Sequence, residues 1–202
     1  MKVIQKDGKT LFTLIIFSEN LAGILNQITN VFTRRQLNIE SLNVSASGTE
    51  NVHCYTITCF SDLETIQIVT RQIEKKIDVI QANYYTNPDI FIMESALYKI
   101  ATPQLLKNKE ISKSIRLYDG KIVEVNPTYA IVSKEGLTDE IVALYRRLKE
   151  CDCLLQYVRS GAIAVTKSHT EELNEFLKQR ELDFEAQKKH SVSTPPHYER
   201  SH

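Results

Sequence analysis

The sequence lacks an excess of charge of either sign. Its 202 residues include 25 Lys plus Arg and 25 Asp plus Glu, so the formal net charge is zero. Nucleic acids and anionic membrane surfaces are bound through clustered positive charge, and no such cluster is present. We therefore expect neither nucleic acid nor a membrane as a partner, and favour small neutral molecules or another protein.

Long apolar runs are also missing. The run at residues 11–17 (LFTLIIF) has the length of a strand, and nothing approaches the roughly 20 apolar residues that span a bilayer. The N-terminal residues do not resemble a signal peptide. The sequence is therefore expected to encode a cytoplasmic protein.

Motifs for metal binding and catalysis are absent as well. Cys54, Cys59, Cys151 and Cys153 form no C-x-x-C pair, and we interpret them as buried reduced thiols. His53 lies next to Cys54, so in a strand the two side chains point to opposite faces and cannot share a metal ion. There is no Gly-rich phosphate loop, G-x-S-x-G or H-E-x-x-H motif. We expect no catalytic residues, metal or cofactor in this chain.

What is present in the first half is an alternation of strand-like and helix-like segments. Apolar residues at helical spacing follow the strand at 11–17 and predict a helix that ends near Arg34 and Arg35. Residues 38–46 and 52–60 indicate a hairpin, and Asp62 is a candidate N-cap for a second helix that runs to about Lys76. Its predicted apolar stripe consists of Ile66, Val69, Thr70, Ile73 and Ile77. With a closing strand at 79–85, the order is βαββαβ, typical of a ferredoxin-like domain with two helices on one face of an antiparallel sheet.

The second half repeats this pattern after the turn Asn87-Pro88-Asp89. The predicted elements are a strand at 95–100, a helix at 104–118, a hairpin at 121–125 and 129–133, a helix at 138–149, a strand at 153–158 and an extension at 161–166. The fold class is therefore α+β, with two tandem ferredoxin-like domains. We divide the chain into an N-terminal arm (1–10), a first domain (11–86), a linker (87–93), a second domain (94–168) and a charged tail (169–202), with a surface helix at 170–187 and a disordered end.

The same topology occurs in RNA recognition modules, which stack bases on aromatic side chains of the central strands. Here Tyr55 and Phe60 fall on opposite faces of their strand, and no basic-and-aromatic RNA signature is present. This class is disfavoured.

The turn between the first strand and the first helix is the strongest candidate site. Asn20 suits the N-cap position, and Gly23 leaves the backbone uncovered by a Cβ. Unpaired N–H groups and the helix dipole can hold a small carboxylate at such a helix start. A purely structural explanation is also open, in which Asn20 only caps the helix and Gly23 only packs against a neighbour.

Residues 18–44 (SENLAGILNQITNVFTRRQLNIESLNV) resemble the small regulatory subunits of acetolactate synthase, also called acetohydroxyacid synthase. The shared motifs are E-N-x-x-G-x-L, F-x-R-R and N-I-E-S-L, and the resemblance continues at 72–81, 94–100, 116–131 and 158–168. Two positions depart from the family pattern: Gln36 stands where a glycine is usual, and the segment starting at His53 lacks a usual arginine.

This resemblance implies a non-catalytic subunit whose first domain is an ACT domain that forms a homodimer and holds an amino acid at the interface. The subunit would activate the large catalytic subunit of this transferase and confer feedback inhibition by valine in branched-chain amino-acid biosynthesis. Thiamine diphosphate, Mg²⁺ and FAD would be bound by the catalytic partner. By position, the effector site would comprise Asn20, Gly23, Ile24 and Leu25, with Asn38 and Ile39 approaching from the second copy. The alternative is a free-standing ACT-domain amino-acid sensor with another partner; a small enzyme is disfavoured because no nucleophile and base set is evident.

Overall fold

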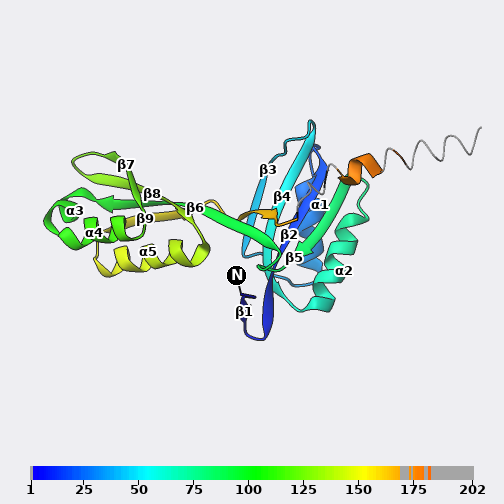
Figure 1. Ribbon diagram of the computed structural model, residues 1–202, viewed down its shortest axis with the longest axis horizontal. Helices are drawn as coiled ribbons and strands as arrows, with labels where there is room; N and C mark the ends of the chain where they lie inside the picture. The colour runs from blue at the N-terminus through cyan, green and yellow to red at the C-terminus, as the bar shows by residue number, and fades with distance from the viewer. Residues whose placement is uncertain (1, 169–172, 174, 180–181, 183–202) are drawn as a thin grey trace, which may run out of the picture. The chain divides into compact units, whose positions relative to one another are not determined.

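The computed structural model describes residues 2–168, 173, 175–179 and 182. Residues 1–167 form one compact unit and residues 168–202 a second. The first unit contains two antiparallel sheets, each with its own helices and hydrophobic core (Figure 1). This arrangement confirms the predicted pair of ferredoxin-like domains.

The first sheet has the strand order β3-β4-β2-β5, with every neighbouring pair antiparallel. The strands are β2 (Lys9–Glu19), β3 (Ser41–Ala46), β4 (Val52–Ser61) and β5 (Val79–Tyr85). A short strand, β1 (Gln5–Lys6), forms a hairpin with the beginning of β2 within the segment predicted as an arm. In this order β3 has a neighbour on one side only, which makes it an edge strand of the sheet.

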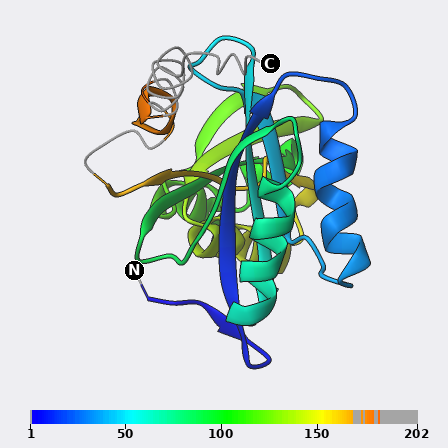
Figure 2. The same cartoon turned by 90° about the vertical axis from the view of Figure 1, so that its right-hand side faces the viewer.

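Two helices, α1 (Ile24–Arg34) and α2 (Leu63–Glu74), lie on the same face of this sheet (Figures 1 and 2). Ile28 of α1 and Ile66 of α2 are fully buried in one core with Ile57 of β4. Asp62 caps α2 as predicted, because its carboxylate accepts a hydrogen bond of 2.7 Å from the Thr65 N–H. The predicted extension of the apolar stripe to Ile77 is wrong: α2 ends at Glu74, and Ile77 is 97% exposed.

The second sheet has the order β7-β8-β6-β9, and β10 adds to the first residues of β6. Its strands are β6 (Ile90–Ala101), β7 (Lys121–Val125), β8 (Tyr129–Gly136), β9 (Leu154–Arg159) and β10 (Ile163–Thr166); its helices are α3 (Thr102–Lys107), α4 (Lys109–Leu117) and α5 (Thr138–Glu150). Tyr98 of β6 is fully buried, and its hydroxyl donates a hydrogen bond to the Ile141 carbonyl at 2.8 Å.

Two elements of this domain differ from their predictions. The single helix expected at 104–118 is broken at Asn108, whose backbone is extended and whose side chain caps α4 by accepting a hydrogen bond from the Glu110 N–H. The strand expected to begin at residue 95 begins at Ile90, because its first residues pair with β10. Residues 90–93 of the predicted linker are therefore part of a strand.

The predicted tail is described only in part. Residues 173, 175–179 and 182 are helical, in the segment expected to form a surface helix. The remainder of the tail, including the end predicted to be disordered, lies outside the described residues. No helix in the described part of the chain has the length and apolarity needed to cross a membrane.

The four cysteine thiols are free. Cys59 and Cys153 are buried, as expected, whereas Cys54 and Cys151 are partly exposed. Burial in the apolar core raises the pKa of Cys59 to about 12. Within the residues that the structure describes, no three His, Cys, Asp or Glu side chains are grouped so that they could hold a metal ion.

Candidate effector site

The turn at residues 20–23 connects the end of β2 to the start of α1. The Asn20 N–H donates a hydrogen bond of 2.9 Å to the Asn51 carbonyl, in the turn between β3 and β4. Asn20 does not cap the helix, contrary to the prediction, because the N-cap is Gly23 and no side chain caps this helix start. The first turn of α1 is thus left without a side-chain acceptor.

Gly23 has a backbone conformation that favours glycine. Its φ of 91° lies in the left-handed region, where a Cβ would be strained. An added Cβ would meet no atom within 4 Å, so Gly23 does not pack closely against a neighbour. The sequence left open that Asn20 only caps the helix and that Gly23 only packs against a neighbour, and the structure shows neither.

The start of α1 offers backbone donors to a ligand. The Gln27 N–H donates to the Gly23 carbonyl at 3.1 Å, whereas the N–H groups of the preceding helical residues have no acceptor within the helix. The first turn carries no acidic side chain. Together with the partial positive charge of the helix N-terminus, these donors suit a small carboxylate.

The side chains of the two following residues point in different directions. Ile24 is buried in the core of the first domain, so it can offer only its backbone to a ligand. Leu25 is 41% exposed, and Leu21 before the helix is 53% exposed. An apolar group bound at this turn could contact these two leucines.

Asn38 and Ile39 lie beyond the opposite end of α1. A helix of 11 residues is about 16 Å long. Asn38 donates to the Glu40 carboxylate at 3.2 Å, and Ile39 packs against the core of the first domain. One copy of the chain therefore does not bring these two residues to the turn at Gly23.

Gln36, the first departure from the family pattern, follows the end of α1 with a φ of 53°. Its N–H donates to the Thr33 carbonyl at 3.0 Å, which closes the last turn of the helix. Glycine adopts this left-handed conformation without strain, whereas another residue pays about 1–2 kcal/mol. The substitution thus preserves the helix end at a cost in stability.

The structure also contains a cavity that the sequence analysis missed. Its volume is about 380 Å³, and Asn87, Glu94 and Arg159 are among the residues that line it. The signal available in the sequence was a single carboxylate, Glu94, directly after the apolar residues 90–93. Its convergence with Arg159 requires the pairing of β6 with β9 and could not be read from the local pattern.

Comparison with known proteins relates both domains to one family. A family profile described as "AHAS small subunit-like ACT domain" matches residues 14–81, and one described as "Small subunit of acetolactate synthase" matches residues 93–168. The acetolactate synthase small subunit of Bacillus subtilis is 31% identical over 160 residues, which cover 79% of this chain and 91% of that protein. The chain belongs to the acetolactate synthase small-subunit family. A second relative, the acetolactate synthase small subunit of Haemophilus influenzae, is 29% identical over 76% of this chain and 94% of its own length.

A crystal structure of the Thermotoga maritima acetolactate synthase small subunit has the same fold. It superposes with a TM-score of 0.70 at 22% identity and covers 79% of this chain and 99% of the other. Membership of the small-subunit family makes the first domain an ACT domain and the chain a regulatory, non-catalytic subunit of a transferase. A small subunit also implies a large catalytic partner, which favours the subunit assignment over a free-standing sensor.

Proposed function

We propose that this acetolactate synthase small subunit binds and activates the large catalytic subunit and makes it sensitive to feedback inhibition by valine. The observation that carries the valine site is the uncapped start of α1 at Gly23, in the domain that matches the ACT profile. Thiamine diphosphate, Mg²⁺ and FAD belong to the catalytic partner, and the complex is cytoplasmic.

The valine carboxylate accepts hydrogen bonds from the free backbone N–H groups of Ile24 and Leu25. The amide oxygen of the exposed Asn20 side chain accepts a hydrogen bond from the ammonium group. The isopropyl group contacts the exposed Leu25 side chain. Each part of the zwitterion thus meets a group of matching chemistry.

The chain forms a homodimer in which β3 pairs with its copy. β3 is an edge strand, and Val44, Ser45 and Ala46 are exposed on it. An exposed edge presents unpaired N–H and C=O groups to another strand, and a two-fold axis makes such a contact self-complementary.

This pairing explains how a second copy completes the site. Ala46 lies opposite His53 and Glu19 opposite Val52, so the end of β3 and the turn after β2 lie at the same end of the sheet. Antiparallel pairing sets the beginning of the other β3 beside that end. Asn38 and Ile39 of the second copy, which precede β3, therefore approach the turn at Gly23.

Complex formation and valine binding test the proposal separately. A tagged chain is mixed with the large subunit from the same organism, and the complex is measured by size-exclusion chromatography; valine binding is measured by calorimetry. We expect co-elution and saturable valine binding. Valine binding without co-elution would instead select the free-standing sensor, and absence of both would refute the proposal.

A further inference from the structure

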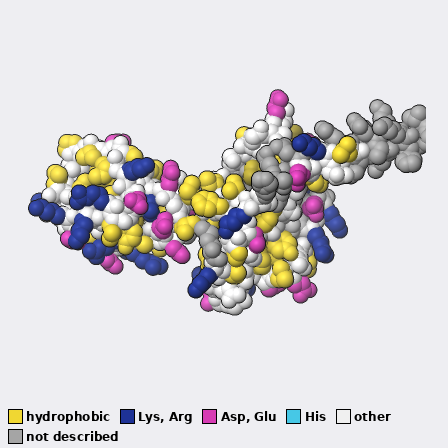
Figure 3. All heavy atoms as spheres, viewed as in Figure 1, with side chains coloured by type: hydrophobic (Ala, Val, Ile, Leu, Met, Phe, Trp, Pro, Cys, Tyr) yellow, Lys and Arg dark blue, Asp and Glu magenta, His cyan; other side chains and the backbone are white. Residues whose placement is uncertain are grey.

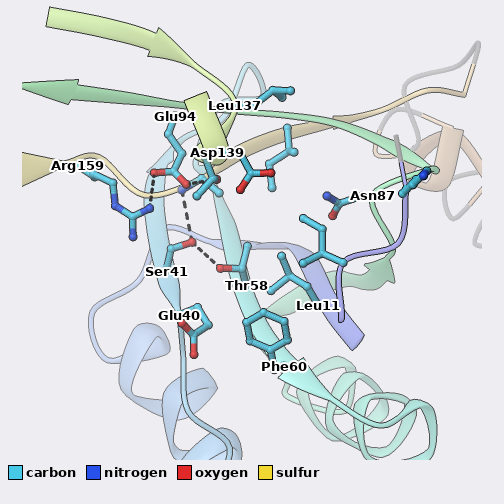
Figure 4. A pocket seen from close by; sticks show the side chains of 15 residues that line it. Leu11, Glu40, Ser41, Thr58, Phe60, Asn87, Glu94, Leu137, Asp139 and Arg159 are labelled. Atoms are coloured by element: carbon cyan, nitrogen blue, oxygen red, sulfur yellow. Dashed lines mark hydrogen bonds and ion pairs between the residues drawn. The ribbon is translucent and has the colours of Figure 1, made fainter. Parts of the chain in front are cut away.

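A cavity of about 380 Å³ lies within the unit formed by residues 1–167 (Figure 4). Its walls come from β2, β3 and β4 of the first sheet, from β6, from the end of β9 and from the start of α5. None of residues 20–25 lines it, so it is separate from the turn at Gly23. Its volume falls in the range of small-molecule sites, about 300–1,000 Å³.

The polar end of the cavity is built around a buried carboxylate. Glu94 is 4% exposed, and its Oε1 accepts a hydrogen bond of 2.5 Å from the Thr138 hydroxyl. Its Oε2 lies 3.3 Å from Arg159 Nη1, close enough for an ion pair, yet accepts no aligned hydrogen bond. Figure 4 shows Glu94 and Arg159 facing each other at this end.

A second acceptor in the same cavity lacks a donor. Asn87 is 6% exposed, and its Oδ1 is buried without a hydrogen-bond partner. Buried polar atoms in proteins nearly always have partners, and both of these atoms are acceptors. A ligand that complements these two atoms would therefore have to offer hydrogen-bond donors.

The charge of the lining favours a cationic donor. The lining includes three carboxylates and two cations, which leaves one net negative charge: Glu40, Glu94 and Asp139 against Lys2 and Arg159. Elsewhere the two signs are interspersed, as Figure 3 shows for the face of the molecule drawn there. An ammonium group suits this site, because a buried carboxylate is stabilised by an additional hydrogen-bonding cation.

The remaining features of the lining suit a zwitterionic ligand with an apolar side chain. About one third of the Arg159 side chain is exposed, and its guanidinium has donors left for a carboxylate. Leu11, Phe60 and Ile92 supply apolar wall. We propose that this cavity is a second amino-acid site, which binds an aliphatic α-amino acid with its ammonium on Glu94, its carboxylate on Arg159 and its side chain against Leu11, Phe60 and Ile92.

An occupied cavity would be linked to the edge strand of the ACT domain. The Ser41 hydroxyl lies 2.7 Å from the Thr58 hydroxyl oxygen and accepts a hydrogen bond of 3.4 Å from the Ala162 N–H. Ser41 and Thr58 line the cavity, and Ser41 is the first residue of β3. The second site thereby connects the segment before β10 to the strand that carries the proposed dimer contact.

Methyl NMR distinguishes the two sites within one sample. The δ1 methyl of Ile92 reports on the cavity and that of Ile24 on the turn at Gly23. The probe is L-leucine, compared with 3-methylbutylamine, which lacks the carboxylate, and 4-methylpentanoate, which lacks the ammonium. We expect a saturable shift of Ile92 with leucine, and binding at least about tenfold weaker for either half-molecule.

Variants identify the groups responsible. Glu94→Gln keeps the shape of the side chain and removes its charge, so it should weaken leucine binding at Ile92 at least about tenfold. Glu135→Gln, an exposed carboxylate on β8 outside the lining, is the matched control and should leave the affinity unchanged. Should Glu94→Gln fail to fold, Arg159→Lys retains the charge but loses the planar fork, and should weaken leucine binding in the same direction.

The proposal does not depend on the valine response. Gly23→Asp should leave the leucine-induced shift of Ile92 intact, and a missing valine response at Ile24 would count only against the proposed function. Three results would each overturn the second site. They are the absence of a saturable Ile92 shift in the unmodified chain, an unchanged leucine affinity in folded Glu94→Gln, and loss of the Ile92 shift in Gly23→Asp.

Discussion

Replacing Gly23 by aspartate should weaken valine binding through charge. An added Cβ at Gly23 meets no neighbouring atom, so the new side chain can extend into the space where the effector carboxylate is proposed to bind. Two carboxylates about 5 Å apart repel by about 0.8 kcal/mol at a dielectric constant of about 80 and by about 3 kcal/mol at an effective value of about 20. These energies correspond to about 4-fold and about 150-fold weaker binding.

Backbone strain must be separated from this charge effect. At a φ of 91° any side chain costs stability, and asparagine tolerates the left-handed region best while carrying no charge. Gly23→Asn therefore matches Gly23→Asp in shape and isolates the repulsion. Gly8→Asp is a second control, because Gly8 has a φ of 74° and open space around it but lies in the turn between β1 and β2.

Calorimetric titration of each variant with valine at low and high salt measures the effect. We expect Gly23→Asp to bind more weakly than Gly23→Asn, with a difference that shrinks at high salt because the repulsion is screened. Gly8→Asp should bind valine like the unmodified chain. Equal affinities of Gly23→Asp and the unmodified chain would refute the site, and equal weakening by both Gly23 substitutions would refute the charge argument.

Three further predictions concern the fold. Ile28→Ala should lower the free energy of unfolding by about 2–5 kcal/mol because Ile28 is fully buried. Ile77→Ala, at an exposed residue, should change it by less than about 0.5 kcal/mol. Urea unfolding compares the two variants, and equal effects would contradict the assigned core. The hydrogen bonds from Thr65 lower the pKa of Asp62. The contribution of Asp62 to stability should therefore be present above the ordinary Asp pKa of about 3.9 and be lost as the pH falls through the lower folded value. Asp62→Asn should remove this part of the pH dependence of the urea midpoint, and an unchanged profile would argue against the cap. Because burial raises the pKa of Cys59 to about 12, this thiol should resist alkylation at pH 8 until the protein unfolds, and rapid labelling of the native protein, located by mass spectrometry, would show that it is accessible.

The order of elements in the first domain was predictable because its signals are local. Apolar spacing defined α1 and α2, and the carboxylate of Asp62 identified a real N-cap. Asn20 was wrongly assigned as the N-cap because asparagine and glycine are both good N-cap residues. What decides between them is the hydrogen bond from Asn20 to Asn51, a residue of the next turn in the sheet.

The second domain shows where longer-range contacts override local pattern. β6 starts at Ile90 because β10, more than 60 residues later, supplies its partner. The only sequence signal for the helix break at position 108 was a polar residue, Asn108, that can cap a new helix. These differences shift element boundaries but leave the βαββαβ order unchanged.

The two candidate sites also differ in whether their residues are close together in the sequence. The turn at Gly23 is contiguous in sequence, and it could be proposed from a short motif. The cavity at Glu94 gathers residues from distant segments, so it became visible only once the strands were paired. Asn38 and Ile39 are a third case, because they can meet the turn only through a second copy of the chain.

The rate of acetolactate formation tests the central claim most directly. It is measured for the catalytic subunit of the same organism alone, with this chain, and with this chain plus valine. The account predicts that the chain raises the rate and that valine reverses the increase. An unchanged rate on addition of the chain would contradict the regulatory role, and an increase that valine does not reverse would contradict the effector site at Gly23.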